Sequence, residues 1–204
     1  MKSIRSRVTM FVTGLALVAM QGCVSITGEP NVEKTTPTFE TRVDNTNPFK
    51  DSVSVGNMDG FKGTSIIAFS GHVSPNMPEH SAREALENGM KNAGILAQKG
   101  AVAKYTLDVN MLVTGEEGML SGANVFSGIT RDMEVKYVLK SNATQKSLYD
   151  EIVKSTGKAS CSNGDGCVSF YLVERVAAER SYKESFTKAI NNIIALGVKQ
   201  SEME

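Results

Sequence analysis

The chain has 204 residues, a length that fits one domain. Hydrophobic residues make up 41% and charged residues 22%, a balance that excludes a disordered chain. The formal net charge is zero, and residues 23–204 alone carry a charge of −3, because the first 22 residues hold three basic side chains and no acidic one. Nucleic-acid binding is not expected, since proteins that bind phosphate backbones concentrate positive charge.

The first 22 residues have the layout of an export signal. Lys2, Arg5 and Arg7 form a basic start, and residues 8–20 that follow are almost wholly apolar. This run is too short for a bilayer core, which needs roughly 20 apolar residues. We therefore expect residues 1–22 to be a signal peptide rather than a transmembrane anchor.

A cysteine directly follows this signal. The run Met20-Gln21-Gly22-Cys23 resembles the lipobox of bacterial lipoproteins, in which the cysteine is acylated and becomes the mature N-terminus. The resemblance implies palmitate and other acyl chains on Cys23. It also implies sorting to the outer membrane with the domain facing the periplasm, because Val24 rather than Asp follows the cysteine. The alternative is a plain signal peptide cut near Gly22.

The other two cysteines, Cys161 and Cys167, are expected to form a disulfide, because pairs of this kind oxidise outside the cytoplasm. Residues 162–166 between them are typical of a turn. Closing a loop of about seven residues would add roughly 2.4 kcal/mol of stability. A zinc site is the alternative, but this spacing without a nearby histidine is not that of zinc ligands.

Residues 23–60 are polar and marked by prolines, so we expect the lipidated N-terminus to continue as a flexible tether, with an edge strand near Val53 and Val55. Residues 61–204 then form a single domain. Alternating apolar residues predict half-buried strands over 103–113 and 132–140. Shorter apolar runs predict strands at 64–70 and 147–155. Apolar residues at three- and four-residue steps predict helices over 78–93 and 172–197.

The order of these elements is β-α-β-β-β-α. We expect an α+β fold, a two-layer sandwich in which a mainly antiparallel sheet of about four strands carries both helices on one face. With the lipobox, this layout resembles small proteobacterial outer-membrane lipoproteins, namely the lipopolysaccharide-assembly lipoprotein and the YajG-like lipoproteins. The resemblance covers residues 64–197. It rests on the order of the elements and on short runs without a diagnostic signature, such as residues 82–90, and it implies no site residues.

No set of residues predicts catalysis, a metal or a cofactor. His72 and His80 flank a strand-to-helix connection. Two ligands leave a metal site short of partners, so we expect both to be solvated loop histidines. The last helix mixes both charges: Glu174, Arg175, Glu179, Arg180, Lys183 and Glu184. We interpret them as a salt-bridged polar face, with a docking surface as the alternative.

Two features point to contacts with other molecules. Apolar side chains lie in the glycine-rich segment 115–128, where they would touch a partner or a membrane, or fold back into the core: Met119, Leu120, Val125 and Phe126. A one-sided sheet with free edges could also accept a partner strand. The sequence thus favours a non-enzymatic envelope lipoprotein that serves an envelope protein complex as an accessory or assembly subunit. The alternative is a lipoprotein that binds lipid or glycan in a cleft between helices and sheet.

Overall fold

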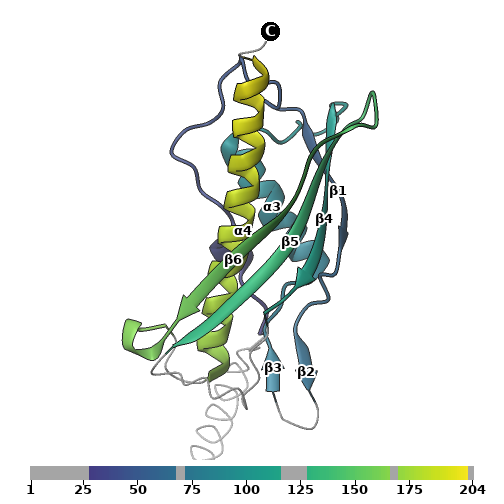
Figure 1. Cartoon of the computed structure of the whole chain (residues 1–204). Helices are drawn as coiled ribbons and strands as arrows, with labels where there is room; N and C mark the ends of the chain where they lie inside the picture. Colours follow the sequence, from purple (N-terminus) through teal and green to yellow (C-terminus); the bar gives the residue numbers. More distant parts are fainter. Residues whose placement is uncertain (1–27, 68–71, 116–127, 166–169, 202–204) are drawn as a thin grey trace, which may run out of the picture.

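The structure is a computed structural model that describes residues 28–67, 72–115, 128–165 and 170–201. A four-stranded sheet carries two long helices on one face (Figure 1), which confirms the predicted two-layer α+β fold. The elements in chain order are α2 (Val32–Thr35), β1 (Val53–Asp59), β2 (Ser65–Ile67), β3 (His72–Ser74), α3 (Glu79–Ala93), β4 (Tyr105–Val113), β5 (Ile129–Ser141), β6 (Ser147–Ala159), a 3-10 helix (Cys161–Asn163) and α4 (Phe170–Ser201).

The strands of the main sheet lie in the order β1-β4-β5-β6. β1 runs parallel to β4 and the other pairs are antiparallel, so the sheet is mainly antiparallel, as predicted. Its first strand is β1 and not the predicted strand at 64–70. Residues 65–67 instead form β2, which pairs with β3 in a separate hairpin. The edge strand expected near Val53 and Val55 is confirmed.

Residues 28–60 are packed on the domain, so the predicted tether is wrong for this range. Phe49 is fully buried, and its ring meets the ring of Tyr105 edge-on at 4.9 Å between centroids. The backbone N–H of Val43 donates to the carbonyl of Ala93 at 2.9 Å. The apolar residues of this segment show no period because an extended chain that wraps over helices buries one side chain at a time.

The core lies between the sheet and the two long helices. Most of the alternating apolar residues predicted for β4 and β5 are buried, but Val113 at the end of β4 is 44% exposed. The apolar residues predicted for one face of each long helix are buried or half-buried. α3 ends at Gly94, whose φ of +84° provides the left-handed C-cap expected of a glycine there. Among the described residues, no helix is both long enough and apolar enough to cross a bilayer.

α4 approaches β6 very closely at Gly157. A Cβ at this position would lie 1.8 Å from the carbonyl oxygen of Ala177. Two residues earlier in the strand, the hydroxyls of Ser155 and Ser181 lie 3.0 Å apart. The small residues let the helix rest on the strand, and this contact fixes the first half of α4 against the edge of the sheet.

Candidate functional site

Most of the predicted contact residues lie outside the residues that the structure describes. This holds for Cys23, for Cys167 and for the apolar set Met119, Leu120, Val125 and Phe126. Cys161 begins the 3-10 helix and is half-buried. The disulfide, the lipid anchor and the apolar contact therefore stay predictions.

The structure describes the side chain of His80, whereas the side chain of His72 lies outside what it describes. His80 is exposed in the first turn of α3, and His72 begins β3. Across residues 28–67, 72–115, 128–165 and 170–201, no group of three or more His, Cys, Asp or Glu side chains could hold a metal ion.

Side chains cover part of the outer edge of β6. Glu184 of α4 accepts a hydrogen bond from the backbone N–H of Thr156 at 2.8 Å. Lys188 donates to the carbonyl of Lys154 at 2.9 Å, and Arg180 donates to the carbonyl of Lys158. Three of the backbone groups that an added strand would need, the carbonyls of Lys154 and Lys158 and the N–H of Thr156, therefore already have partners.

The opposite edge of the sheet is covered in a similar way. Arg83 of α3 donates to the carbonyls of Val55 and Gly56, at 3.3 and 2.9 Å. Further along β1, the N–H of Ala97 donates to the carbonyl of Val53 at 2.9 Å. Strand addition, one of the two contact modes expected from the sequence, is therefore disfavoured at these positions.

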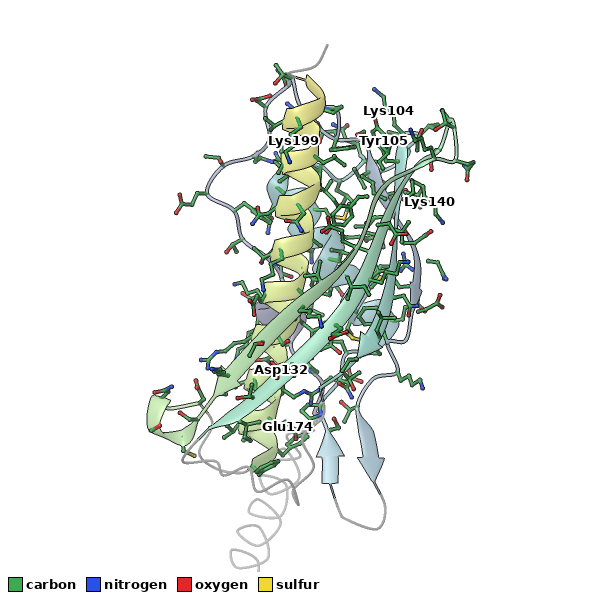
Figure 2. All side chains as sticks on the ribbon, viewed as in Figure 1. Lys104, Tyr105, Asp132, Lys140, Glu174 and Lys199 are labelled. Carbon is green, nitrogen blue, oxygen red and sulfur yellow. The ribbon has the colours of Figure 1, made fainter. Side chains whose placement is uncertain are left out.

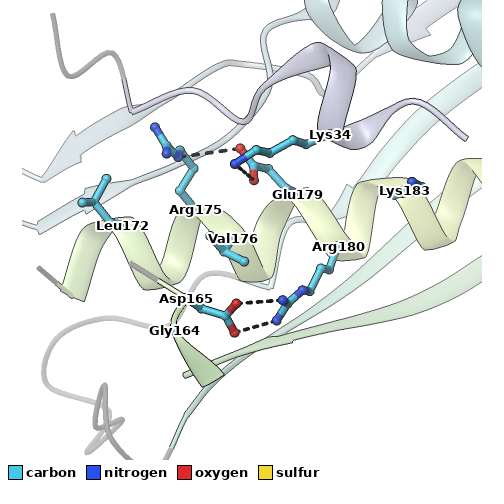
Figure 3. A pocket seen from close by; sticks show the side chains of 9 residues that line it. All are labelled: Lys34, Gly164, Asp165, Leu172, Arg175, Val176, Glu179, Arg180 and Lys183. Atoms are coloured by element: carbon cyan, nitrogen blue, oxygen red, sulfur yellow. Dashed lines mark hydrogen bonds and ion pairs between the residues drawn. The ribbon is translucent and has the colours of Figure 1, made fainter. Parts of the chain in front are cut away.

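A charged groove of about 540 Å³ lies along the first half of α4 (Figure 3). α2 forms one wall and the turn after the 3-10 helix forms the other, while two apolar side chains of α4, Leu172 and Val176, lie between them. The remaining lining residues are Lys34, Gly164, Asp165, Arg175, Glu179, Arg180 and Lys183.

Two of the cations in this groove share one carboxylate. Glu179 is 4% exposed and lies 3.6 Å from Arg175 and 4.0 Å from Lys34. It also accepts the backbone N–H of Asn31 at 3.0 Å. The Nε atom of Arg175 is buried and makes no hydrogen bond within the described part of the chain. At 3.6 and 4.0 Å, both ion pairs of Glu179 are longer than a hydrogen bond. The side chain of Lys34 is 60% exposed.

The other wall holds a compact ion pair. Both guanidinium Nη atoms of Arg180 lie 2.8 Å from a carboxylate oxygen of Asp165. The hydrogen bonds from Arg180 hold the pKa of Asp165 below its ordinary value. Asp165 also accepts the N–H of Ser160 at 3.1 Å. The pair is neutral as a unit and fixes the turn after the 3-10 helix to α4.

The predicted polar face of α4 is therefore only partly confirmed. Arg175 pairs with Glu179, and Lys188 pairs with Glu184 at 2.7 Å. Glu174, however, is fully buried and pairs with Arg131 of β5 at 2.9 Å. The sequence carried a signal for this pair, since the alternation of β5 puts Arg131 on the same face as Met133 and Val135.

By sequence, the chain matches no protein-family model and no curated protein. By structure, it is similar to a predicted lipoprotein from Caulobacter crescentus CB15, with a TM-score of 0.52 and 12% identity over 77% of this chain and 98% of that one. It is also similar to a protein from Xanthomonas campestris that is assigned to the family model DUF330, with a TM-score of 0.53 and 11% identity over 82% and 98%. At such identities the likeness shows a shared fold, one that is found in a predicted lipoprotein.

Proposed function

We propose that this protein is a lipid-anchored, non-enzymatic component of the bacterial cell envelope, held by acylated Cys23 to the outer membrane with its domain in the periplasm. In this role it serves an envelope complex as an accessory or assembly subunit. The export signal and lipobox support the anchor, and the fold shared with a predicted lipoprotein agrees with it.

The packing of the N-terminal segment is the observation that carries this proposal furthest. Gly28 lies against Tyr171 so closely that a Cβ on Gly28 would be 0.9 Å from the phenol oxygen. Cys23 precedes Gly28 by only five residues. An acylated Cys23 would therefore hold the domain next to the membrane surface, a position suited to a subunit that works with membrane partners.

A lipid or glycan carrier is the second candidate, but its expected cleft is filled. The space between the helices and the sheet holds side chains with no exposure, among them Leu86, Tyr137 and Phe186. The charged groove beside α4 is the observation that favours a ligand-binding role. Any such ligand would bind on the surface of the domain and not inside it.

Cells that express the native chain or Cys23→Ala test the anchor and the partner together. We expect native protein to take up a palmitate analogue, to fractionate with the outer membrane and to crosslink to defined envelope proteins. The Cys23→Ala chain should do none of these. Native protein that fractionates as unacylated periplasmic protein would contradict the anchor. A membrane-bound native chain that crosslinks to no protein would contradict the subunit role.

A further inference from the structure

The short connection to Cys23 limits which part of the domain can meet the membrane. Five residues of fully extended chain span about 17 Å. If Cys23 is acylated, as proposed above, the bilayer surface lies within that distance of Gly28. Gly28 rests on Tyr171, in the first turn of α4. The first half of α4 and the elements beside it are therefore the membrane-proximal part of the domain.

The charged groove lies in this part of the domain. Its lining residues on α4 begin at Leu172, directly after Tyr171, and extend to Lys183. The wall that α2 forms includes Lys34, which follows Gly28 by six residues in the segment that packs on α4. The far end of the molecule carries the C-terminal end of α4 and the start of β4 (Figure 1).

The groove carries excess positive charge. Arg180 and Asp165 neutralise each other, so the remaining charges are those of Lys34, Arg175, Lys183 and the single carboxylate Glu179. No ion pair of Lys183 is found among the described residues. The three cations and one carboxylate leave a net charge of +2 over an apolar floor of Leu172 and Val176.

We propose that this groove is a membrane-docking surface that receives the phosphate headgroup of an anionic phospholipid in the bilayer to which Cys23 is attached. Lys34, whose side chain is 60% exposed, and the half-buried Lys183 contribute two of the cations. Arg175, held at 3.6 Å from Glu179, presents a guanidinium whose charge its own partner neutralises incompletely. The lipid anchor brings the surface into range, and the groove orients the domain on the membrane. The proposal rests on the proposed lipidation.

Vesicle cosedimentation of the unacylated chain, residues 23–204 with Cys23→Ser, separates the groove from the anchor. All described elements follow residue 27, so this chain keeps the whole described fold. We expect it to bind vesicles of equal phosphatidylglycerol and phosphatidylcholine, and to bind them more weakly as salt rises. Binding to vesicles of phosphatidylcholine alone should be at least tenfold weaker, on the order of the loss of two charge contacts.

The matched pair of variants is Lys34→Ala with Lys183→Ala against Lys104→Ala with Lys199→Ala. Lys104 and Lys199 are exposed at the opposite end of the molecule from Glu174 (Figure 2). Each lysine near an anionic surface contributes about 1 kcal/mol, so the groove variant should lose about 30-fold in vesicle affinity. The control variant should lose less than about threefold, because charges beyond a Debye length are screened. Thermal unfolding of both variants checks that the fold is kept.

Equal losses in the two variants, or equal binding to neutral vesicles, would overturn the docking surface. Displacement of the chain from vesicles by millimolar inorganic phosphate would also overturn it, because the groove would then be a site for small free anions. Failure of the anchor is a separate result. It would appear as native protein without acylation in cells, whatever the vesicles show.

Discussion

Arg131 and Glu174 form an ion pair between β5 and α4, with 2.9 Å between Nη1 and Oε1 and no exposure of either side chain. The same guanidinium donates to the side chain of Asn76 at 2.7 Å and to the carbonyl of Thr114 at 2.8 Å. One buried arginine thus joins the sheet, the last helix, the connection before α3 and the end of β4. This network fixes the end of the domain from which α4 starts.

Removing one member of this pair should destabilise the protein strongly. We expect Arg131→Met or Glu174→Met to lower the free energy of unfolding by about 3–5 kcal/mol, because the remaining charge is left buried without its partner. Urea unfolding followed by circular dichroism measures the loss. Glu179→Met removes another α4 carboxylate of low exposure whose cation partners remain partly solvated, and it should lose less.

The double variant Arg131→Met with Glu174→Met separates the pair from simple overpacking. We expect it to lose less than the sum of the two single losses, because replacing both partners of a buried pair by apolar residues leaves no lone charge. Additive losses would mean that the ion pair has no coupling energy, and that each side chain acts only through its own packing.

Hydrogen exchange distinguishes a packed N-terminal segment from a tether. The N–H groups of Val43, Asp51 and Val53 donate to carbonyls of residues 93–95 at 2.9–3.0 Å. We therefore expect peptides covering 41–53 to exchange at rates close to those of α3, since opening them requires the helix end to separate. Mass spectrometry of proteolytic fragments measures the rates. Exchange of 41–53 at the rate of an unstructured peptide would contradict the packing.

The sequence predicted the layers of this fold because periodicity reports burial on one face. The alternation of Leu107 and Val109 in β4, and the steps from Tyr182 to Phe186 in α4, both correspond to buried stripes. The packing of residues 28–52, before the expected edge strand, escaped prediction because an extended chain that packs on helices has no period to detect. The buried residues of this segment, such as Thr35 and Phe49, are set by the shape of the surface beneath them.

The groove could not be assembled from the sequence for a related reason. Lys34 and Lys183 are far apart in the chain, and only the docking of α2 on α4 brings them into one lining. The charges of α4 were visible, but their pairing depends on partners in other elements. Arg180 pairs with Asp165, which precedes the helix, and Glu174 turns inward to Arg131.

The cysteine pair offers a test of both compartment and stability. If Cys161 and Cys167 form the predicted disulfide, protein purified from the periplasm should react with a thiol reagent at these positions only after reduction. Reduction should lower the free energy of unfolding by about 2.4 kcal/mol, the value expected for a short loop. The chain with both cysteines changed to serine should show no effect of reductant. Full thiol labelling without reduction would contradict the disulfide.

Protonation of Asp165 in acid should lower the stability of the protein. Because hydrogen bonds from Arg180 lower the pKa of Asp165 in the folded state, the unfolded chain, with an Asp pKa of about 3.9, binds the proton more readily. The stabilisation is therefore fully present above about pH 5 and is lost as pH falls through the folded-state pKa. The free energy of unfolding, measured with urea between about pH 7 and 3, should fall less on acidification for Asp165→Asn than for the native chain. Its matched control, Asp150→Asn, removes an aspartate from an exposed ion pair and should keep the native slope. Identical slopes for Asp165→Asn and the native chain would mean that the pair with Arg180 does not persist in solution.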